Sequence, residues 1–298
     1  HIYFHSLFIF HCPFSIRMPL ISTIVLNYET PGATKKCIEA LQRQSIANQL
    51  EIIVVDNASR DNSIAQLRSF KEIQTCHPER VTPEVKISIL EAKTNLGYGA
   101  GNNLGAASAR GEFLLIVNPD TALRPDALGK MVQFLKEHLD IGIVGPQLIL
   151  PDGTIRDSYR TFPTVADIFI KRSFLRFFFP SRMRSYLQWD ASPYDTRDTD
   201  WIVGACLFLR RDFFQKLHGF DARFFLFFED TDLCRRCWEV GKRVVYFPEA
   251  QADDSEHRLS SGGMFSFLRR KTVRVHLVSA AKYFWKWRRG EVRKVQRT

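Results

Sequence analysis

Short apolar runs alternate with longer stretches of helical periodicity along most of the chain. The apolar runs are rich in Val, Ile and Leu and end at turn residues, which predicts buried strands at 20–26, 51–55, 85–90, 112–117, 142–150, 201–209 and 243–247. The stretches between them predict helices at 31–44, 63–70, 100–109 and 125–137. Strands that alternate with helices are typical of an α/β fold, here a central, mostly parallel sheet flanked by helices.

Polar residues stand repeatedly where a predicted strand ends, the edge at which parallel sheets bind ligands. They are Asn27, Tyr28, Asp56, Asn57, Asn118 and Asp120. A carboxylate such as Asp56 can accept a hydrogen bond from a base or a ribose hydroxyl, although an Asx-turn or a helix N-cap is the favoured explanation when Asp56 is taken alone. Asp120 offers an oxygen of the kind that Mg²⁺ or Mn²⁺ prefers, with a strand-ending turn as the alternative.

A glycine-rich turn runs from Asn95 through Gly97, Gly99 and Gly101. Glycines at alternate positions let a backbone approach a phosphate or a sugar closely. The spacing resembles a dinucleotide-binding loop but is imperfect, and no acidic residue follows at a strand end about twenty residues later. A nucleotide-binding dehydrogenase that uses the Gly97–Gly101 loop is therefore one alternative function.

Three carboxylates, Glu229, Asp230 and Asp232, follow directly after the aromatic run at 224–228. Apolar surroundings destabilise a charged carboxylate and make it a stronger base, and neighbouring like charges push proton affinities apart. The same residues also suit the first turn of a helix, where acidic side chains interact favourably with the macrodipole. The cluster thus has a catalytic and a structural interpretation.

The order of these motifs is more specific than any one of them. Taken together with Gly204-Ala205 and His257, they resemble the family-2 glycosyltransferases of the GT-A (Rossmann-like) fold, especially the bacterial rhamnosyltransferase-like branch, over about 20–263. The resemblance implies inverting transfer of a sugar from a nucleotide-diphosphate donor, with dTDP-L-rhamnose as the first expectation, to a cell-surface or lipid-linked glycan. A catalytically inactive, membrane-associated glycan-binding protein is a further alternative.

The resemblance also implies roles for individual residues. Asp230 matches the catalytic base. Glu229 and Asp232 are expected to orient the loop or bind acceptor hydroxyls, and Arg236 to help the metal neutralise the leaving group. Trp201 could stack on a sugar face, although a core tryptophan is the commoner outcome. Asn27, Tyr28, Asp56, Asn57, Asn95, Gly97 and Asn118 match donor-binding positions. Asp120 matches the last carboxylate of a D-x-D metal motif that here reads Asn-Pro-Asp, and His257 matches a histidine that can complete the Mg²⁺ or Mn²⁺ shell, with a surface-loop histidine as the alternative.

The charge of the 298-residue chain is unevenly distributed. The net charge is +10, yet residues 264–298 hold eleven Lys or Arg and a single acid, so the remainder is close to neutral. Aromatic residues interleave with basic ones both in this tail and in a Phe- and Arg-rich insertion at 164–189. That pattern suits peripheral contact with an anionic membrane more than nucleic acid, with a packed helix bearing a solvated basic face as the alternative for the tail.

We expect four segments along the chain. Residues 1–17 are expected to be a non-native or disordered leader, with a short membrane-seeking segment as the alternative. Residues 18–125 form the nucleotide-sugar-binding half and 126–263 the acceptor-binding, catalytic half of one domain, and 264–298 a basic amphipathic helical tail. The expected location is cytoplasmic, at the inner face of the cell membrane. The spacing of Cys234 and Cys237 lacks a second ligand pair and argues against a zinc site.

Overall fold

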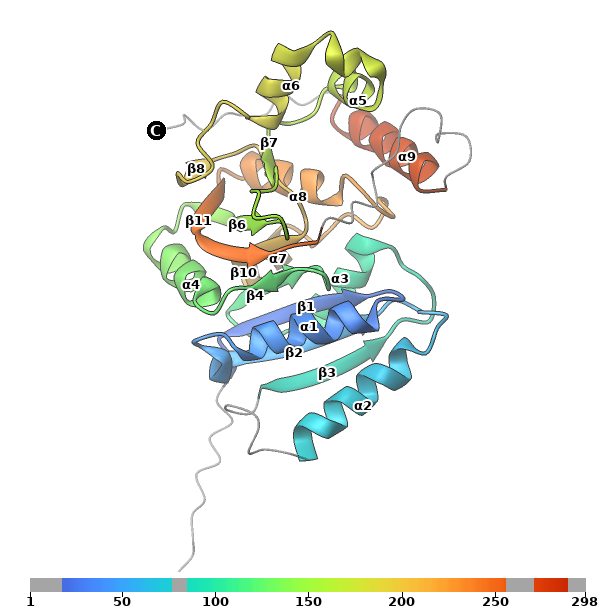
Figure 1. The fold of residues 1–298 in the computed structure, drawn as a ribbon, viewed down its shortest axis with the longest axis vertical. Helices are drawn as coiled ribbons and strands as arrows, with labels where there is room; N and C mark the ends of the chain where they lie inside the picture. The colour runs from blue at the N-terminus through green and yellow to red at the C-terminus, as the bar shows by residue number, and fades with distance from the viewer. Residues whose placement is uncertain (1–17, 77–84, 256–270, 289–298) are drawn as a thin grey trace, which may run out of the picture.

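The computed structural model describes residues 18–76, 85–255 and 271–288. Within them a large mixed sheet runs in the order β3-β2-β1-β4-β10-β6-β11-β5, with β8 added on β11, and helices cover both faces (Figure 1). The expected α/β architecture is confirmed. In these residues no helix combines the length and the apolar character that crossing a bilayer requires.

The first half of the chain builds the parallel part of the sheet. Its elements are β1 (Ile21–Asn27), α1 (Pro31–Gln42), η1 (Ala47–Gln49), β2 (Leu50–Asp56), α2 (Ser63–Cys76), β3 (Lys86–Glu91), α3 (Tyr98–Ala107) and β4 (Phe113–Val117). In the parallel register Asn27 is opposite Asp56, and Asp56 is opposite Glu91. Polar residues at the strand ends are therefore gathered along one edge of the sheet.

The second half adds mixed strands. Its elements are β5 (Ala122–Leu123), α4 (Ala127–Glu137), β6 (Ile141–Ile149), β7 (Tyr159–Arg160), β8 (Arg197–Asp198), β9 (Trp201–Ile202), β10 (Cys206–Arg210), α7 (Arg211–Lys216), α8 (Glu229–Glu239) and β11 (Arg243–Asp253). Strand β10 is antiparallel to both β4 and β6, whereas β6 and β11 are parallel. This half is thus less parallel than the first.

The prediction of a single strand at 201–209 is wrong. It divides into β9, which pairs with β7 in a separate two-stranded sheet, and β10 in the main sheet. Between them the backbone N–H of Gly204 donates to the carboxylate of Asp230 at 2.9 Å. A side chain from a distant helix thus takes the hydrogen bond that would have continued the ladder.

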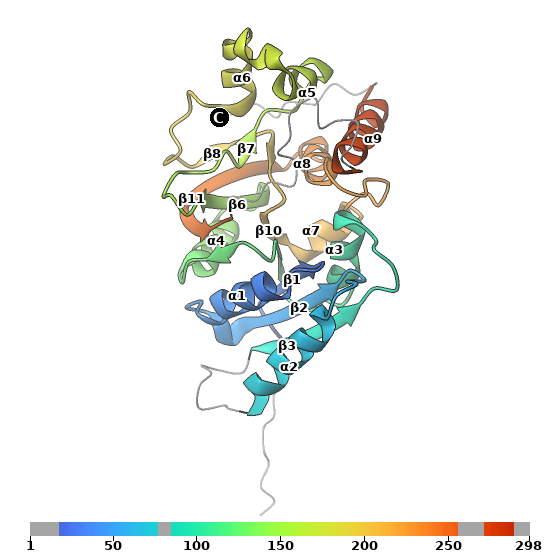
Figure 2. The same cartoon turned by 45° about the vertical axis from the view of Figure 1, so that its right-hand side comes forward.

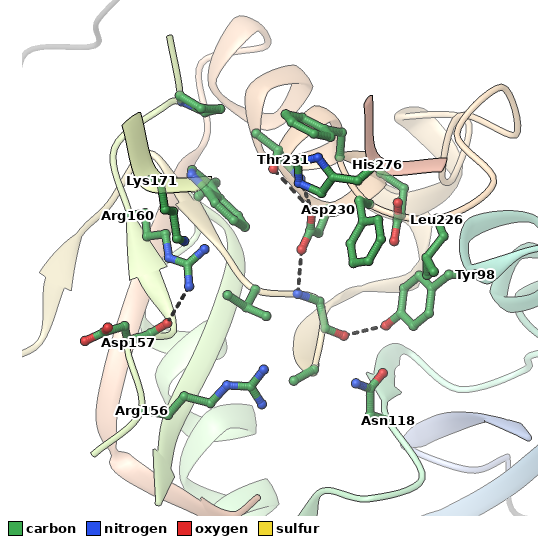
Figure 3. Close-up of a pocket in the computed structure, with 18 of the residues that line it drawn as sticks. Tyr98, Asn118, Arg156, Asp157, Arg160, Lys171, Leu226, Asp230, Thr231 and His276 are labelled. Carbon is green, nitrogen blue, oxygen red and sulfur yellow. Dashed lines mark hydrogen bonds between the residues drawn. The ribbon is translucent and has the colours of Figure 1, made fainter. Parts of the chain in front are cut away.

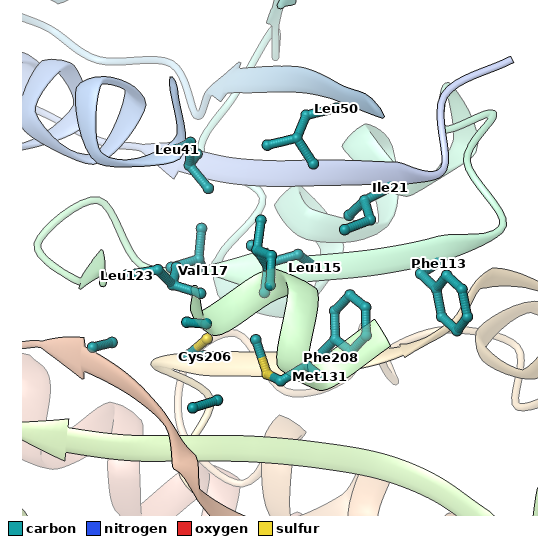
Figure 4. Packing of buried hydrophobic residues seen from close by; sticks show 14 of the residues in the cluster. Ile21, Leu41, Leu50, Phe113, Leu115, Val117, Leu123, Met131, Cys206 and Phe208 are labelled. Atoms are coloured by element: carbon teal, nitrogen blue, oxygen red, sulfur yellow. The ribbon is translucent and has the colours of Figure 1, made fainter. Parts of the chain in front are cut away.

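Alternate residues of the central strands pack on opposite faces, although nearly all of them are buried. On one face Ile21 and Leu115 join a cluster that includes side chains of α1, α2 and α4 (Figure 4). On the other, Ile24 and Ile116 join a cluster with α3, α7 and α8. The two clusters form a three-layer core that holds the sheet edge rigidly.

Two further elements lie beyond the β6–β11 part of the sheet, at the end of the molecule away from β3 (Figures 1 and 2). Residues 164–189, here called the cap, contain α5 (Val165–Arg172), η3 (Phe174–Phe177) and α6 (Pro180–Leu187). Helix α9 (Lys271–Lys286) lies beside α5 and packs Ala280 and Tyr283 against Phe224 and Phe228 of the loop before α8. The described part of the tail is thus a docked helix.

Candidate functional site

A cavity of about 1700 Å³ opens between the polar edge of the sheet, the cap and α9. Its lining comes from the ends of β1, β2 and β4, the loop before α3, the segment between β9 and β10, the loop leading into α8, and the cap. These are the strand-end and motif segments that the sequence singled out. The fold thus brings positions as far apart as Leu26 and His276 into one site.

Asp230 lies in the first turn of α8, where it faces the cavity (Figure 3). One carboxylate oxygen accepts the N–H of Gly204 at 2.9 Å, and the other accepts the N–H of Thr231 at 2.7 Å. The hydroxyl of Tyr98 donates to the carbonyl oxygen of the same residue, Gly204. Burial raises the pKa of Asp230 above its ordinary value, as a general base requires.

Glu229 is the second carboxylate of the cavity wall and is only 5% exposed. Burial, together with the neighbouring charge of Asp230, raises its pKa well above the ordinary value. In the part of the chain that the structure describes, its Oε2 atom has no hydrogen-bond partner. The pair therefore combines a hydrogen-bonded carboxylate with a buried one that favours the protonated form.

The structure does not place Asp232 and Arg236 in the cavity lining. Asp232 is fully buried and accepts from Arg236 Nε at 2.8 Å, from Lys286 Nζ at 2.6 Å and from Trp287 Nε1 at 3.0 Å. Of the roles expected for Asp232, these contacts favour orienting the chain around α8, and they engage the Arg236 Nε atom. The physical reason is helical spacing: Asp232 and Arg236 are one turn apart on α8, where Asp232 meets Lys286 of α9 and Arg236 also donates to the carbonyl of Leu217.

Five of the expected donor-binding residues line the cavity, and two lie behind it. The lining residues are Tyr28, Asn57, Asn95, Gly97 and Asn118. Asn27 is fully buried and donates to Asp56 at 2.7 Å, and Asp56 in turn accepts from the hydroxyl of Ser59 at 2.6 Å. Asn27 and Asp56 thus shape the turns on which the lining residues stand.

The glycine-rich turn packs against protein rather than leaving room for a cofactor phosphate. Gly97 has a φ of 83°, and a Cβ there would lie 2.1 Å from the carbonyl oxygen of Phe225. A Cβ at Gly99 would meet Phe220 at 2.9 Å, and one at Gly101 would meet Leu26 at 2.6 Å. The glycines are explained by close packing around the loop before α8, which removes the main support for the dehydrogenase alternative.

Asp120 is the candidate metal ligand that the described residues contain. It lines the cavity and accepts a hydrogen bond from the hydroxyl of Ser255, another lining residue. The nearby Asp254 is paired with Arg156 and Thr121. No group of three His, Cys, Asp or Glu side chains gathers within residues 18–76, 85–255 and 271–288, and His257 lies outside them. One carboxylate fits a hard cation that completes its shell with phosphate and water.

Four basic side chains of the lining escaped the sequence analysis as individual residues: Arg156, Arg160, Lys171 and Arg176. Figure 3 shows the first three on the side of the cavity opposite Tyr98. The Arg160 guanidinium lies 5.2 Å from the Trp201 ring centre, and the Trp201 indole N–H donates to Thr161 at 2.8 Å. Trp201 lines the cavity but is only 6% exposed, which favours the core interpretation over stacking on a sugar.

The model of the family described as "Glycosyl transferase family 2" matches residues 22–217, more than half of the chain. The chain belongs to this family. The glycosyltransferase is 30% identical over 258 residues to the N-acetylglucosaminyl-diphospho-decaprenol L-rhamnosyltransferase of Mycobacterium tuberculosis, covering 82% of this chain and 78% of the relative. It is 26% identical to rhamnosyltransferase WbbL of Escherichia coli, over 63% of this chain and 69% of that one.

Solved structures share the fold of this glycosyltransferase. GalNAc-T7 with UDP, GalNAc and Mn²⁺ superimposes with a TM-score of 0.63 at 11% identity, covering 92% of this chain and 49% of that one. The mannosyltransferase PcManGT of Pyrobaculum calidifontis, with GDP-Man and Mn²⁺, gives 0.56 at 16% identity, covering 92% and 76%. The family resemblance and the GT-A fold inferred from the ordered motifs are confirmed.

Proposed function

We propose that this glycosyltransferase moves a sugar, with inversion, from a nucleotide-diphosphate donor to a hydroxyl of a lipid-linked glycan. The observation that carries the proposal is Asp230, a carboxylate of raised pKa, fixed by two backbone N–H groups at the wall of a large cavity. The donor portion would occupy the sheet edge near Tyr28, Asn57 and Asn118. The acceptor would enter from the cap side.

The reaction is a single displacement. The acceptor hydroxyl gives its proton to Asp230 as its oxygen bonds to the anomeric carbon, while the bond from that carbon to the diphosphate oxygen breaks and its electrons leave with the nucleotide. Arg156 is paired with Asp254 and lines the cavity with Asp120, and its guanidinium would help to neutralise the leaving diphosphate. A Mg²⁺ or Mn²⁺ held by Asp120, with His257 as a further ligand, would supply additional positive charge there.

The substrates are proposed from the relatives. The mycobacterial relative is named for L-rhamnose transfer to a decaprenyl-diphosphate-linked sugar, which favours dTDP-L-rhamnose as donor and a lipid-linked glycan as acceptor here. A lipid-linked acceptor also favours peripheral contact with an anionic membrane, on its cytoplasmic face. Buried Glu229 would orient the reacting groups from beside Asp230.

A panel of nucleotide sugars tests the proposal. The full chain is mixed with dTDP-, UDP- and GDP-sugars, with Mn²⁺, Mg²⁺ or a chelator, and scored for thermal stabilisation and for slow donor hydrolysis. One donor is expected to stabilise the protein and to be hydrolysed, more strongly with metal. Absence of both responses to every donor would refute the transferase proposal.

A further inference from the structure

Two surfaces of this protein combine aromatic and basic residues, and the structure distinguishes them. Helix α9 uses its apolar side for packing: Ala280 is 6% and Tyr283 1% exposed. Ser279 on the same helix donates to the carbonyl of Leu226 at 2.9 Å, and Lys286 pairs with buried Asp232. The apolar side of α9 is therefore already covered by the loop before α8 and by α8 itself.

The cap exposes its aromatic residues instead. Val165 and Phe169 lie four residues apart on α5, hence on one helix face, and are 64% and 60% exposed. Four more follow in and after η3: Phe174 at 60%, Phe177 and Phe178 at 71% each, and Phe179 at 48%. Contiguous exposed aromatics of this kind mark an interaction surface.

These aromatics are not needed for the cap's own core. That core consists of Ile170, Met183, Tyr186 and Leu187, all buried. Helix α5 is further secured by a capping box between Thr164 and Asp167. The exposed phenylalanines therefore require an explanation outside the cap.

The charge around them indicates the partner. The segment 165–189 contains five Lys or Arg and one acid, and that acid, Asp167, is paired with Arg182. The Arg176 guanidinium lies 4.8 Å from the Phe177 ring centre, so cation and aromatic ring are side by side. Aromatic side chains next to basic ones suit the boundary between anionic headgroups and acyl chains.

The same segment also forms the mouth of the cavity. Phe174 and Phe177 line the cavity while remaining more than half exposed, and Lys171 and Arg176 line it beside them. An amphiphile with a lipid tail, a diphosphate and a sugar fits this order of surfaces. The lipid tail matches the apolar rim, the diphosphate matches the basic side chains, and the sugar matches the carboxylate.

We propose that the cap, rather than the C-terminal helix, is the membrane-docking surface, and that it admits the lipid-linked acceptor from an anionic bilayer directly into the cavity. The acceptor's diphosphate lies against Lys171 and Arg176, and its sugar reaches toward Asp230. The identity of the acceptor rests on the proposed function, whereas the docking of the cap on a lipid surface is independent of it.

Vesicle co-sedimentation of the full chain tests the docking surface. The double variant Phe169→Ser/Phe178→Ser removes two exposed side chains that do not line the cavity. We expect its partitioning onto phosphatidylglycerol-containing vesicles to fall about tenfold or more, because two aromatic surfaces no longer leave water. The wild type is expected to bind phosphatidylcholine vesicles much more weakly, since they lack the anionic charge.

A matched control is Leu139→Ser/Val240→Ser, two residues that are 68% and 45% exposed and lie just before the starts of the parallel strands β6 and β11. Its binding is expected to equal the wild type. Both double variants should keep the wild-type melting temperature and donor affinity, and Phe178→Ser alone provides a milder second variant, with a smaller loss. Unchanged binding in both cap variants, or a tenfold loss on Val278→Ser/Trp285→Ser of α9 instead, would overturn the proposal.

The two proposals fail in different ways. A protein that docks on vesicles through the cap but turns over no nucleotide sugar would refute the transferase and leave the docking surface standing. A protein that transfers sugar equally well to short-chain and membrane-embedded acceptors, with or without the cap phenylalanines, would refute the docking surface alone.

Discussion

Replacing Asp230 with Asn removes a charge and a base while preserving shape. The wild-type carboxylate accepts from Gly204 at 2.9 Å and from Thr231 at 2.7 Å. The amide can keep one acceptor, but its NH₂ group then faces a backbone N–H, which costs about 1–3 kcal/mol. Relief of the buried charge offsets part of this cost, so the free energy of unfolding should change by only about 1–2 kcal/mol.

The effect on catalysis should be much larger. General-base catalysis typically contributes about 10²–10⁴-fold, or about 3–5 kcal/mol of activation free energy. Because burial raises the pKa of Asp230, wild-type transfer should increase with pH through a pKa above that of an ordinary Asp. The Asp230→Asn variant should lose this limb of the pH profile together with its activity, whereas donor affinity should stay close to the wild type.

Single-turnover transfer, donor titration and urea unfolding on the same preparations check these expectations. Asp157→Asn is the control, because this carboxylate also lines the cavity but accepts its hydrogen bond from the Trp189 indole and not from Gly204 or Thr231. The Asp157→Asn variant should keep most of the transfer activity and the same increase of activity with pH. Activity of Asp230→Asn within about tenfold of wild type, or loss of donor binding in proportion to activity, would refute the assignment as base.

Three further substitutions separate structural from chemical roles. The pKa of buried Glu229 is raised in the folded state, so the free energy of unfolding falls as pH rises from the ordinary carboxyl pKa toward the raised one. The melting temperature of Glu229→Gln should therefore rise relative to that of the wild type across this pH range. Parallel plots of melting temperature against pH for the two proteins would contradict this. Asp232→Ala leaves Arg236 and Lys286 without their buried carboxylate, so the free energy of unfolding in urea should fall by about 3 kcal/mol while the donor affinity of the folded protein stays unchanged. A changed acceptor KM with no loss of stability would instead indicate that Asp232 binds the acceptor. Gly97→Ala forces a Cβ toward Phe225, so it should lower the free energy of unfolding by at least about 2 kcal/mol and weaken donor binding. Gly32→Ala is the control, because a Cβ there meets no atom within 4 Å, and it should be neutral or stabilising. Equal effects of the two substitutions would refute the packing argument.

Local patterns predicted most of the fold. The run at 51–55 reappears as β2 and the run at 112–117 as β4, because buried strands need continuous β-branched and apolar residues whatever surrounds them. Helix α8 begins at Glu229, as the acidic first turn indicated. The family could be recognised from the order of the strand-end motifs. That order is read directly from the chain and does not require knowledge of how the side chains pack.

The direction in which side chains face required the tertiary structure. Sequence proximity grouped Asp232 with Asp230, yet helical geometry and the docking of α9 direct one toward Lys286 and the other toward Gly204. The break at Gly204 was invisible locally for the same reason, because its hydrogen-bond partner lies 26 residues away.

The sequence by itself determined the elements, the family and the chemical types present, since these depend on short-range pattern and motif order. Only the tertiary structure decided which charges meet in the cavity, that Lys171 and Arg176 of the cap line it, and that α9 is a packed helix while the cap exposes its phenylalanines. The physical reason is that burial and pairing arise between segments far apart in the chain, and composition alone does not specify the partner.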